Sequence, residues 1–388
     1  MFTFHVIGLP HTQVVKEENK CAYTTKVLRF CNMMKSLGHD VYLYGGGDKT
    51  DADCTQFISC ISSQEQEKYF GQVDTDKDFY PIEWDSNLPY WKIMNHTAIA
   101  EISKRIKKTD FICLIGGDCQ KVVADAFPIN TSVEFGVGYK GVFSKFRVFE
   151  SYSFMHYVYG LKNIDNGLNY DIVIPNYYDV NEFPFSDKRE DYFLFIGRLV
   201  GRKGANIAVQ ACEKYGAKLI MAGQGVIERN GQMFKSNELS IDKEHVTHIG
   251  SVDIQKRGEL MSKARAVFVQ TQYIGPFEGV HIESNLCGVP VITTDWGVFC
   301  ETVKNGYNGF RTRTMGEILY SMDQCDKMDI DHRKKIQNWA VDNFSLDRVK
   351  MQYQYYFEQL MDLWSQGYYS NWSEGIKNNR YSEYARRK

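Results

Sequence analysis

The feature that most constrains the fold of this chain is a strand–helix alternation that runs through two stretches of its sequence. In the first stretch, the apolar runs at residues 2–8 and 110–117 alternate with segments of helical apolar spacing, such as residues 22–38. In the second, the apolar runs at residues 192–197 and 217–223 flank another helix-patterned segment. Such alternation predicts parallel sheets with helices on their faces, and therefore an α/β fold.

A polar, turn-rich segment separates the two stretches. Residues 180–192, VNEFPFSDKREDY, include Pro184 and have the composition of a linker. The length of 388 residues also suits two domains. We therefore expect an N-terminal Rossmann-like domain over residues 1–185 and a C-terminal one over residues 186–344. Residues 345–388 begin with a long amphipathic helical pattern and end in a polar, basic tail.

Composition and charge exclude several classes of protein. The chain is 43% hydrophobic and 24% charged with a net charge of −2, which argues against a protein built to coat nucleic acid. No apolar run approaches the roughly 18 residues of a membrane span, and the first residues lack the pattern of a signal peptide. Ten scattered cysteines read as reduced thiols, so a cytoplasmic location is expected.

Two cations follow the first strand of the second stretch. Arg198 comes directly after Gly197, and Lys203 stands just before a predicted helix. Ligands bind at the carboxyl ends of strands in open α/β sheets, and cations beside a helix N-terminus suit a diphosphate. A solvated basic turn is the alternative interpretation. After the next strand, Gly223 and Gly225 predict a tight turn that leaves room for a ligand.

A second candidate segment is GPFEGVHIE, residues 275–283, which joins a strand to a helix expected to start near Gly279. The backbone amides from Phe277 to Val280 would face the crevice and could bind phosphate oxygens. Glu283, about one turn into the helix, could accept hydrogen bonds from a ribose diol. Two plainer interpretations stay open: Glu283 could be a solvated helix acid, and Glu278 could simply favour the helix dipole.

Together these segments resemble the retaining family 4 of the GT-B glycosyltransferases. GRLVGRKG, residues 197–204, matches the GR…KG phosphate motif of that family, and residues 275–309 match most of the motif that contains its E-x7-E pair. The resemblance is strongest from Asp191 to Gly309. It implies two Rossmann-like domains that face a central cleft, with the long C-terminal helix crossing back to the N-terminal domain.

The resemblance also implies roles for individual residues. Arg198 and Lys203 would stabilise the leaving diphosphate, Glu283 would hold the ribose, and the segment near Gly250 would lie against the nucleobase. The first acid of E-x7-E falls on Gly275, and Glu278 could compensate for its absence. The implied donor-binding set is Gly197, Gly223, Gly225, Gly250, Gly275, Phe277, Glu278, Gly279, Val280 and Glu283.

Many relatives carry a histidine after an N-terminal strand, near the reacting carbon. The matching stretch here, residues 132–139, has Glu134 and no histidine. Glu134 and His156 are therefore further catalytic candidates, and His11 is a candidate on the acceptor side. A lone histidine is more often structural.

The implied reaction moves a hexose-like sugar from a UDP- or GDP-sugar to an acceptor hydroxyl, without a metal or any further cofactor. Asp51–Asp53 and Asp74–Asp78 contain Asp-x-Asp patterns, but their polar surroundings read as solvated loops. A sugar-nucleotide epimerase of the same fold and a nucleotide-sugar binding protein without turnover remain alternatives. A dinucleotide-dependent oxidoreductase is disfavoured because the first βα turn, GLPHTQ, lacks G-x-G-x-x-G.

The sequence says less about the acceptor. Residues 139–154 mix aromatic side chains with Lys140, Lys145 and Arg147. This segment could contact an anionic membrane and a lipid-linked acceptor at its surface. It could also approach DNA, as in virus-type base glycosyltransferases, although nucleic acid is less favoured than a glycan or lipid-linked glycan. Ordinary surface and core of the N-terminal domain is the plain alternative.

Overall fold

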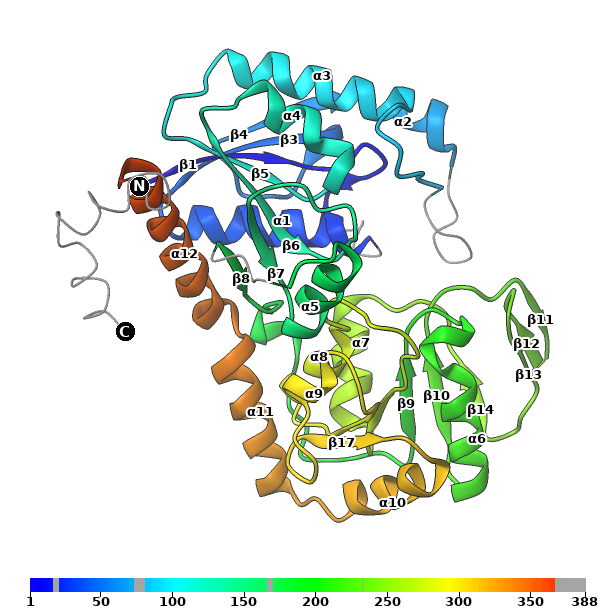
Figure 1. The fold of residues 1–388 in the computed structure, drawn as a ribbon. Coiled ribbons are helices and arrows are strands. Elements are labelled where there is room, and N and C mark those ends of the chain that lie inside the picture. The colour runs from blue at the N-terminus through cyan, green and yellow to red at the C-terminus, as the bar shows by residue number, and fades with distance from the viewer. Residues whose placement is uncertain (17–20, 73–80, 166–169, 232, 367–388) are drawn as a thin grey trace.

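The computed structural model describes residues 1–16, 21–72, 81–165, 170–231 and 233–366. Two parallel sheets form two lobes, one above the other in Figure 1. Helices cover both sheets, as the strand–helix alternation predicted. The α/β class with two Rossmann-like units is therefore confirmed.

The sheet of the first lobe has the strand order β2-β3-β1-β5-β6-β7-β8, with β4 paired to β3. Its central strands are apolar runs buried on both faces, as parallel strands between helices are. Its strands are β1 (Thr3–Ile7), β2 (Gln13–Val14), β3 (Asp40–Thr50), β4 (Gln56–Ile61), β5 (Phe111–Leu114), β6 (Thr131–Val137), β7 (Phe146–Phe149) and β8 (Asp171–Val173). Its helices are α1 (Ala22–Ser36), α2 (Ser63–Phe70), α3 (Pro89–Ser103), α4 (Lys121–Ala126) and α5 (Tyr152–Leu161).

The sheet of the second lobe has the order β14-β10-β9-β15-β16-β17, and a small antiparallel sheet, β11-β12-β13, lies beside it. The main strands are β9 (Phe193–Ile196), β10 (Leu219–Ala222), β14 (Val246–His248), β15 (Val267–Val269), β16 (Val291–Thr294) and β17 (Gly309–Thr312). The small strands are β11 (Glu228–Asn230), β12 (Met233–Lys235) and β13 (Ser240–Ile241). The helices are α6 (Ala205–Tyr215), α7 (Ile254–Lys263), α8 (Val280–Leu286), α9 (Phe299–Thr302), α10 (Met315–Asp326) and α11 (Ile330–Phe344).

The chain passes between the lobes at two places that lie side by side. Tyr178 lies where the chain enters the second lobe, and Ser345 lies where it leaves that lobe. The two residues form a parallel bridge. The backbone amide of Tyr178 donates to Phe344 O at 3.0 Å, and that of Leu346 donates to Tyr178 O at 2.9 Å. These paired crossings connect the two lobes.

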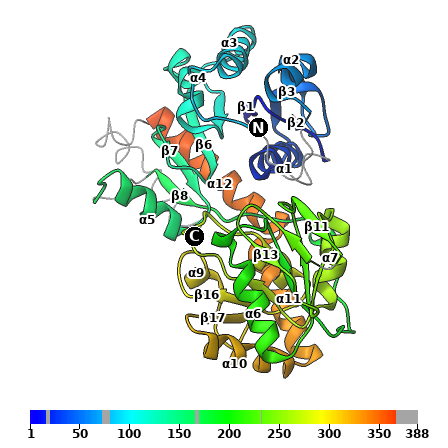
Figure 2. The same cartoon turned by 90° about the vertical axis from the view of Figure 1, so that its right-hand side faces the viewer.

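The last described helix, α12 (Leu346–Gln366), returns to the first lobe. Both views place α11 against the second lobe and α12 against the first (Figures 1 and 2). The ring of Phe357 lies 4.6 Å from that of Phe4 and 5.0 Å from that of Phe111, centroid to centroid. Helix α12 thus completes the core of the first lobe. Among the described residues, no helix has both the length and the apolar character needed to cross a bilayer.

The lobes also meet where α9 approaches the start of α5. The carboxylate of Glu301 accepts hydrogen bonds from the backbone amides of Tyr152, at 3.0 Å, and Ser153, at 2.6 Å. Ser151 Oγ, which also accepts from Phe154 N in the same first turn, donates to Pro276 O of the second lobe at 2.7 Å. A carboxylate of one lobe therefore binds the positive end of a helix of the other, an arrangement that holds the two lobes together.

Glu301→Ala is expected to open the molecule, because the charge-assisted bonds to α5 are lost. Loss of these bonds costs about 1–2 kcal/mol, which would lower the ratio of closed to open molecules roughly tenfold. Small-angle scattering should then show a larger radius of gyration. Glu317→Ala is the control, since Glu317 belongs to a capping box within the second lobe, at the start of α10. Equal scattering curves for the two variants would contradict the interlobe role of Glu301.

Candidate functional site

The carboxyl ends of β9 and β10 pack so closely that only glycine fits between them. Gly197 N donates to Ala222 O at 3.0 Å, and a Cβ on Gly223 would lie 1.9 Å from Gly197 O. Gly223 N in turn donates to Gly250 O at 2.9 Å. Gly225, with φ of 108°, follows in the same turn. The structure therefore brings together the four glycines that the sequence nominated in three separate segments.

The two predicted cations flank this glycine cluster on the side that faces the first lobe. Arg198 follows Gly197 and is near enough to Tyr23, in the first turn of α1, to affect its titration. Burial raises the pKa of Tyr23, and the charge of Arg198 opposes that rise. Lys203 Nζ forms an ion pair with Glu278 and lies 5.1 Å from the ring centroid of Tyr273. Lys203 is thus held by Glu278, whereas Arg198 lies close enough to the first lobe for its charge to act on Tyr23.

The segment from Gly275 to Glu283 forms the loop and first turn of α8, as predicted. The backbone amides of Ile282 and Glu283 both donate to Gly279 O at 3.0 Å, so the helical turn starts there. The ring of Phe277 is buried, 5.5 Å from His281 and 5.9 Å from Phe344. Phe277 therefore anchors the loop, and its side chain is packed inside the second lobe. Val280 begins the helix.

Glu283 has a protein partner that sequence reasoning missed. Its carboxylate oxygens lie 3.1 and 3.3 Å from Nη1 of Arg257, on α7, and the side chain is almost buried. Glu283 raises the pKa of Arg257, so the guanidinium stays charged. Nearby, Tyr178 OH donates to Gly279 O at 3.3 Å. Glu283 is thus a paired, buried carboxylate and not the solvated helix acid of the plainer interpretation.

The first lobe contributes a buried ion pair that the sequence did not reveal. Lys26 Nζ lies 2.6 Å from Glu150 Oε1 and donates to Gly136 O at 3.1 Å. Burial raises the pKa of Glu150, Lys26 lowers it, and the charge of Glu278 across the cleft raises it again. The lobes touch here, because a Cβ on Gly138 would lie 3.0 Å from Pro276. Glu150 directly follows β7, and its place at the carboxyl end of a strand was a usable signal.

The structure does not bring Glu134 or His156 to this cluster. Glu134 is fully buried, and its carboxylate accepts from Tyr139 OH at 3.1 Å, Phe143 N at 3.0 Å and Ser144 N at 2.8 Å. It thereby holds the loop after β6. His156 is exposed on α5, with its ring 6.3 Å from that of Tyr152. These contacts give Glu134 a structural role and place His156 on the surface.

His11 lies beside the start of α1. Its Nε2 is 3.5 Å from Cys21 Sγ, and its ring is 6.2 Å from that of Phe70. Burial lowers the pKa of His11 to about 3, so the imidazole is neutral. It is therefore part of the packed first lobe near the cleft and carries no charge for a ligand.

Glu134→Gln is expected to weaken the pH dependence of the free energy of unfolding and to leave the activity intact. Burial raises the pKa of Glu134 from 4.5 to about 7. Between these values the unfolded chain releases a proton that the folded chain keeps, so the free energy of unfolding falls by up to about 1.4 kcal/mol per pH unit as pH rises. The glutamine amide can keep the same loop contacts without this titration. Urea unfolding from pH 4.5 to 7 measures the slope; a loss of activity by orders of magnitude would instead support a catalytic Glu134.

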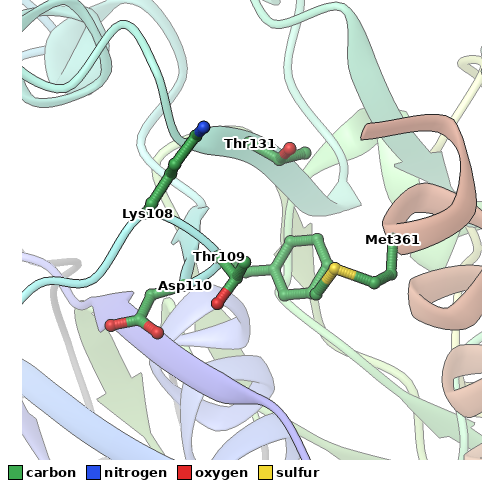
Figure 3. A pocket seen from close by; sticks show the side chains of 6 residues that line it. Lys108, Thr109, Asp110, Thr131 and Met361 are labelled. Carbon is green, nitrogen blue, oxygen red and sulfur yellow. The ribbon is translucent and has the colours of Figure 1, made fainter. Parts of the chain in front are cut away.

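Among the described residues, one Asp-x-Asp pattern and one shallow hollow lie away from this cluster. Asp51 Oδ2 accepts from Lys16 N at 2.8 Å in a surface turn, and Asp74–Asp78 lies outside the described residues. Within the described ranges, no group of three His, Cys, Asp or Glu is arranged to hold a metal. A shallow hollow of about 160 Å³ is lined by Lys108, Thr109, Asp110, Phe111, Thr131 and Met361 (Figure 3). It lies at the amino ends of β5 and β6, the opposite edge of the sheet from the candidate site.

Comparison with known proteins links this geometry to a family. Residues 180–314 match the model of the family Glycosyl transferases group 1. An uncharacterized glycosyltransferase of Methanocaldococcus jannaschii is 30% identical over 149 residues, which are 38% of this chain and 37% of that protein. The matches span less than half the length of the curated relatives, 37% and 45%.

Solved structures extend the likeness to nearly the whole chain. A glycosyltransferase from Rickettsia africae is similar with a TM-score of 0.65 and 16% identity, covering 93% of this chain and 99% of the other. The Anabaena protein HepE in complex with UDP-glucose is similar with a TM-score of 0.63 and 15% identity, covering 94% and 100%. The chain therefore has the GT-B fold of these glycosyltransferases, and its residues 180–314 are similar to the family Glycosyl transferases group 1.

Proposed function

We propose that this protein transfers a sugar from a nucleoside diphosphate sugar to a hydroxyl group of an acceptor. The observation that carries the proposal is the close packing of Gly197, Gly223 and Gly250 at the carboxyl ends of β9 and β10, directly beside Arg198 and the Lys203–Glu278 ion pair. A diphosphate that lies on the glycine turns would meet Arg198, Lys203 and the first amides of α8. The resemblance to HepE, whose structure contains UDP-glucose, supports a UDP-sugar ahead of a GDP-sugar.

The residues of the site suit the departure of a nucleoside diphosphate. Breaking the glycosidic bond builds negative charge on the diphosphate, and preorganised positive groups stabilise that charge most where water is excluded. Arg198 supplies a full charge, while the start of α8 supplies oriented amides. These groups supply the charge that a metal provides in other transferases, so we propose a metal-independent reaction.

We further propose that the reaction retains the configuration of the anomeric carbon. The buried acids near the cleft are already paired, Glu150 with Lys26 and Glu283 with Arg257. Such pairing disfavours attack by either carboxylate, which supports same-face attack by the acceptor with help from the leaving phosphate. In this scheme residues 186–344 bind the donor, residues 1–185 bind a glycan or lipid-linked acceptor, and α12 ties the last part of the chain to the acceptor side.

The test is a thermal-shift panel followed by product analysis. UDP-glucose, UDP-N-acetylglucosamine and GDP-mannose are each compared with the bare nucleoside diphosphate, and we expect one of the sugars to raise the melting temperature by several degrees. NMR of the product then reports transfer and anomeric configuration. Absence of any shift would overturn the proposal. Binding without turnover on an acceptor panel would favour a non-catalytic binding protein, and release of an isomerised free sugar would indicate an epimerase.

A further inference from the structure

The backbone of Glu278 is in a conformation that glutamate rarely adopts. Its φ is +60°, in the left-handed region, and among the described non-glycine residues only Asn163 shares a positive φ. Asparagine tolerates this region, whereas for a glutamate it carries a cost of order 1 kcal/mol or more. An acid that served only the dipole of α8 would not need such a backbone. We therefore expect the contacts of the Glu278 side chain to offset the cost of this conformation.

The side chain of Glu278 is a fixed, ionised carboxylate. Its Oε2 pairs with Lys203 Nζ and accepts a hydrogen bond from Thr271 Oγ1 at 3.1 Å, with 7% of the side chain exposed. Burial opposes ionisation, but Lys203, Tyr273 and Thr271 outweigh it, so the pKa of Glu278 lies below its usual value. The charge of Glu278 also reaches Glu150 across the cleft. The carboxylate thus stands between the basic loop of the second lobe and the Lys26–Glu150 pair of the first.

Gly275 and Glu278 compete for one space. A Cβ on residue 275 would lie 2.2 Å from Glu278 Oε1 and 2.8 Å from its Cδ, far inside contact distance. Residue 275 is the position where the E-x7-E pattern, counted back from Glu283, places its first acid. The carboxylate of Glu278 therefore occupies the space of the missing side chain, reached from three residues further along the chain.

We propose that Glu278 is the relocated acid of this site and binds hydroxyl groups of the donor's glycosyl unit, with Gly275 as its obligatory complement. A carboxylate repels phosphate oxygens and accepts hydrogen bonds from hydroxyls, so its ligand is the sugar and not the diphosphate. Lys203 offsets the cost of its buried charge and fixes its direction. The inference rests on the proposed function, since it presumes a nucleoside diphosphate sugar.

The experiment is a reciprocal exchange measured by calorimetry. UDP and UDP-glucose, or GDP and GDP-mannose if that pair shifts the wild type, are titrated into Glu278→Gly, Gly275→Glu and the double variant. Glu278→Gly should leave the Kd for the bare diphosphate within about threefold and weaken the sugar nucleotide at least tenfold. The double variant should regain an affinity for the sugar nucleotide within about threefold of the wild type. Such recovery would be non-additive, because the two residues share one space.

Two controls separate this role from a structural one. Glycine relieves the left-handed backbone at residue 278, so Glu278→Gly should melt within a few degrees of the wild type despite its loss of affinity. Glu278→Gln keeps the side-chain volume and the Thr271 contact. It should also weaken the sugar nucleotide selectively, but by a smaller factor than Glu278→Gly. It replaces Glu278→Gly if that variant does not fold.

Each contrary outcome has a separate meaning. Equal weakening of both ligands by Glu278→Gly would assign Glu278 to holding Lys203 alone and overturn the inference. Unchanged affinities, or a double variant no better than the sum of the single variants, would overturn it as well. A wild type that binds neither probe overturns the proposed function and this inference with it.

Discussion

Arg198→Ala is expected to lower turnover by about 10²–10³-fold, the loss that follows removal of one preorganised group from a developing negative charge. Arg198 follows Gly197 at the end of β9, beside the turn of Gly223 and Gly225, and its charge acts on Tyr23 of the first lobe. Lys203→Ala should cost less, because the ion pair with Glu278 already offsets part of its charge. Initial rates of nucleotide release at saturating donor measure both.

Arg202→Ala is the matched control for this prediction. Arg202 lies in the same loop, is exposed, and has its guanidinium 4.8 Å from the ring centroid of Tyr273. Its removal takes away the same charge at a surface position and should leave turnover within a fewfold of the wild type. Near-wild-type rates for Arg198→Ala, or equal losses for Arg198→Ala and Arg202→Ala, would contradict the role given to Arg198.

Gly204→Ala is expected to destabilise the second lobe by about 3 kcal/mol or more, through overpacking and left-handed backbone together. Gly204 has φ of 74°, and a Cβ there would lie 2.1 Å from Gln270 O. Gln270 cannot retreat, because its buried side chain donates to Ile292 O at 3.1 Å. Urea unfolding followed by circular dichroism gives the loss of free energy of unfolding.

Gly216→Ala isolates the contribution of backbone conformation. Gly216 ends α6 with the same φ of 74°, but nothing lies within 4 Å of the Cβ it would gain. It should therefore lose only about 1 kcal/mol. The difference between the two variants measures the close approach of the phosphate-motif loop to the end of β15. Equal losses at residues 204 and 216 would show that no such close approach exists in solution.

Much of the fold could be predicted because its signals are local. The runs that became β5 and β9 are apolar along their whole length, and such runs are typical of buried parallel strands. The strands β11, β12 and β13 have two or three residues each, too few for any periodicity. Helix α11 was missed for another reason: Arg333 stands on its buried face and donates to the carbonyls of Ser186, Ser262 and Gly288. A charged residue in that position breaks the apolar pattern.

Some residues of the candidate site could likewise be predicted from the sequence, and others could not. The glycines and cations could be nominated because each stands at a strand end in the sequence. The partners of the buried acids could not, since Arg257 lies 26 residues before Glu283 and Lys26 lies far from Glu150. Their proximity is a product of tertiary packing. The left-handed backbone of Glu278 could not be predicted either, because a positive φ is expected at glycine and not at glutamate. The ligand roles of all these residues stay predictions.

The return of α12 has a consequence for how the protein is made. The aromatic cluster of Phe4 and Phe111 is closed by Phe357, so the earliest and latest parts of the described chain share one core. A ribosome must synthesise the entire second lobe before that ring emerges. Until then, Phe4 and Phe111 lack the ring that packs against them in the folded protein, whereas the sheet of the second lobe contains no strand from outside residues 193–312.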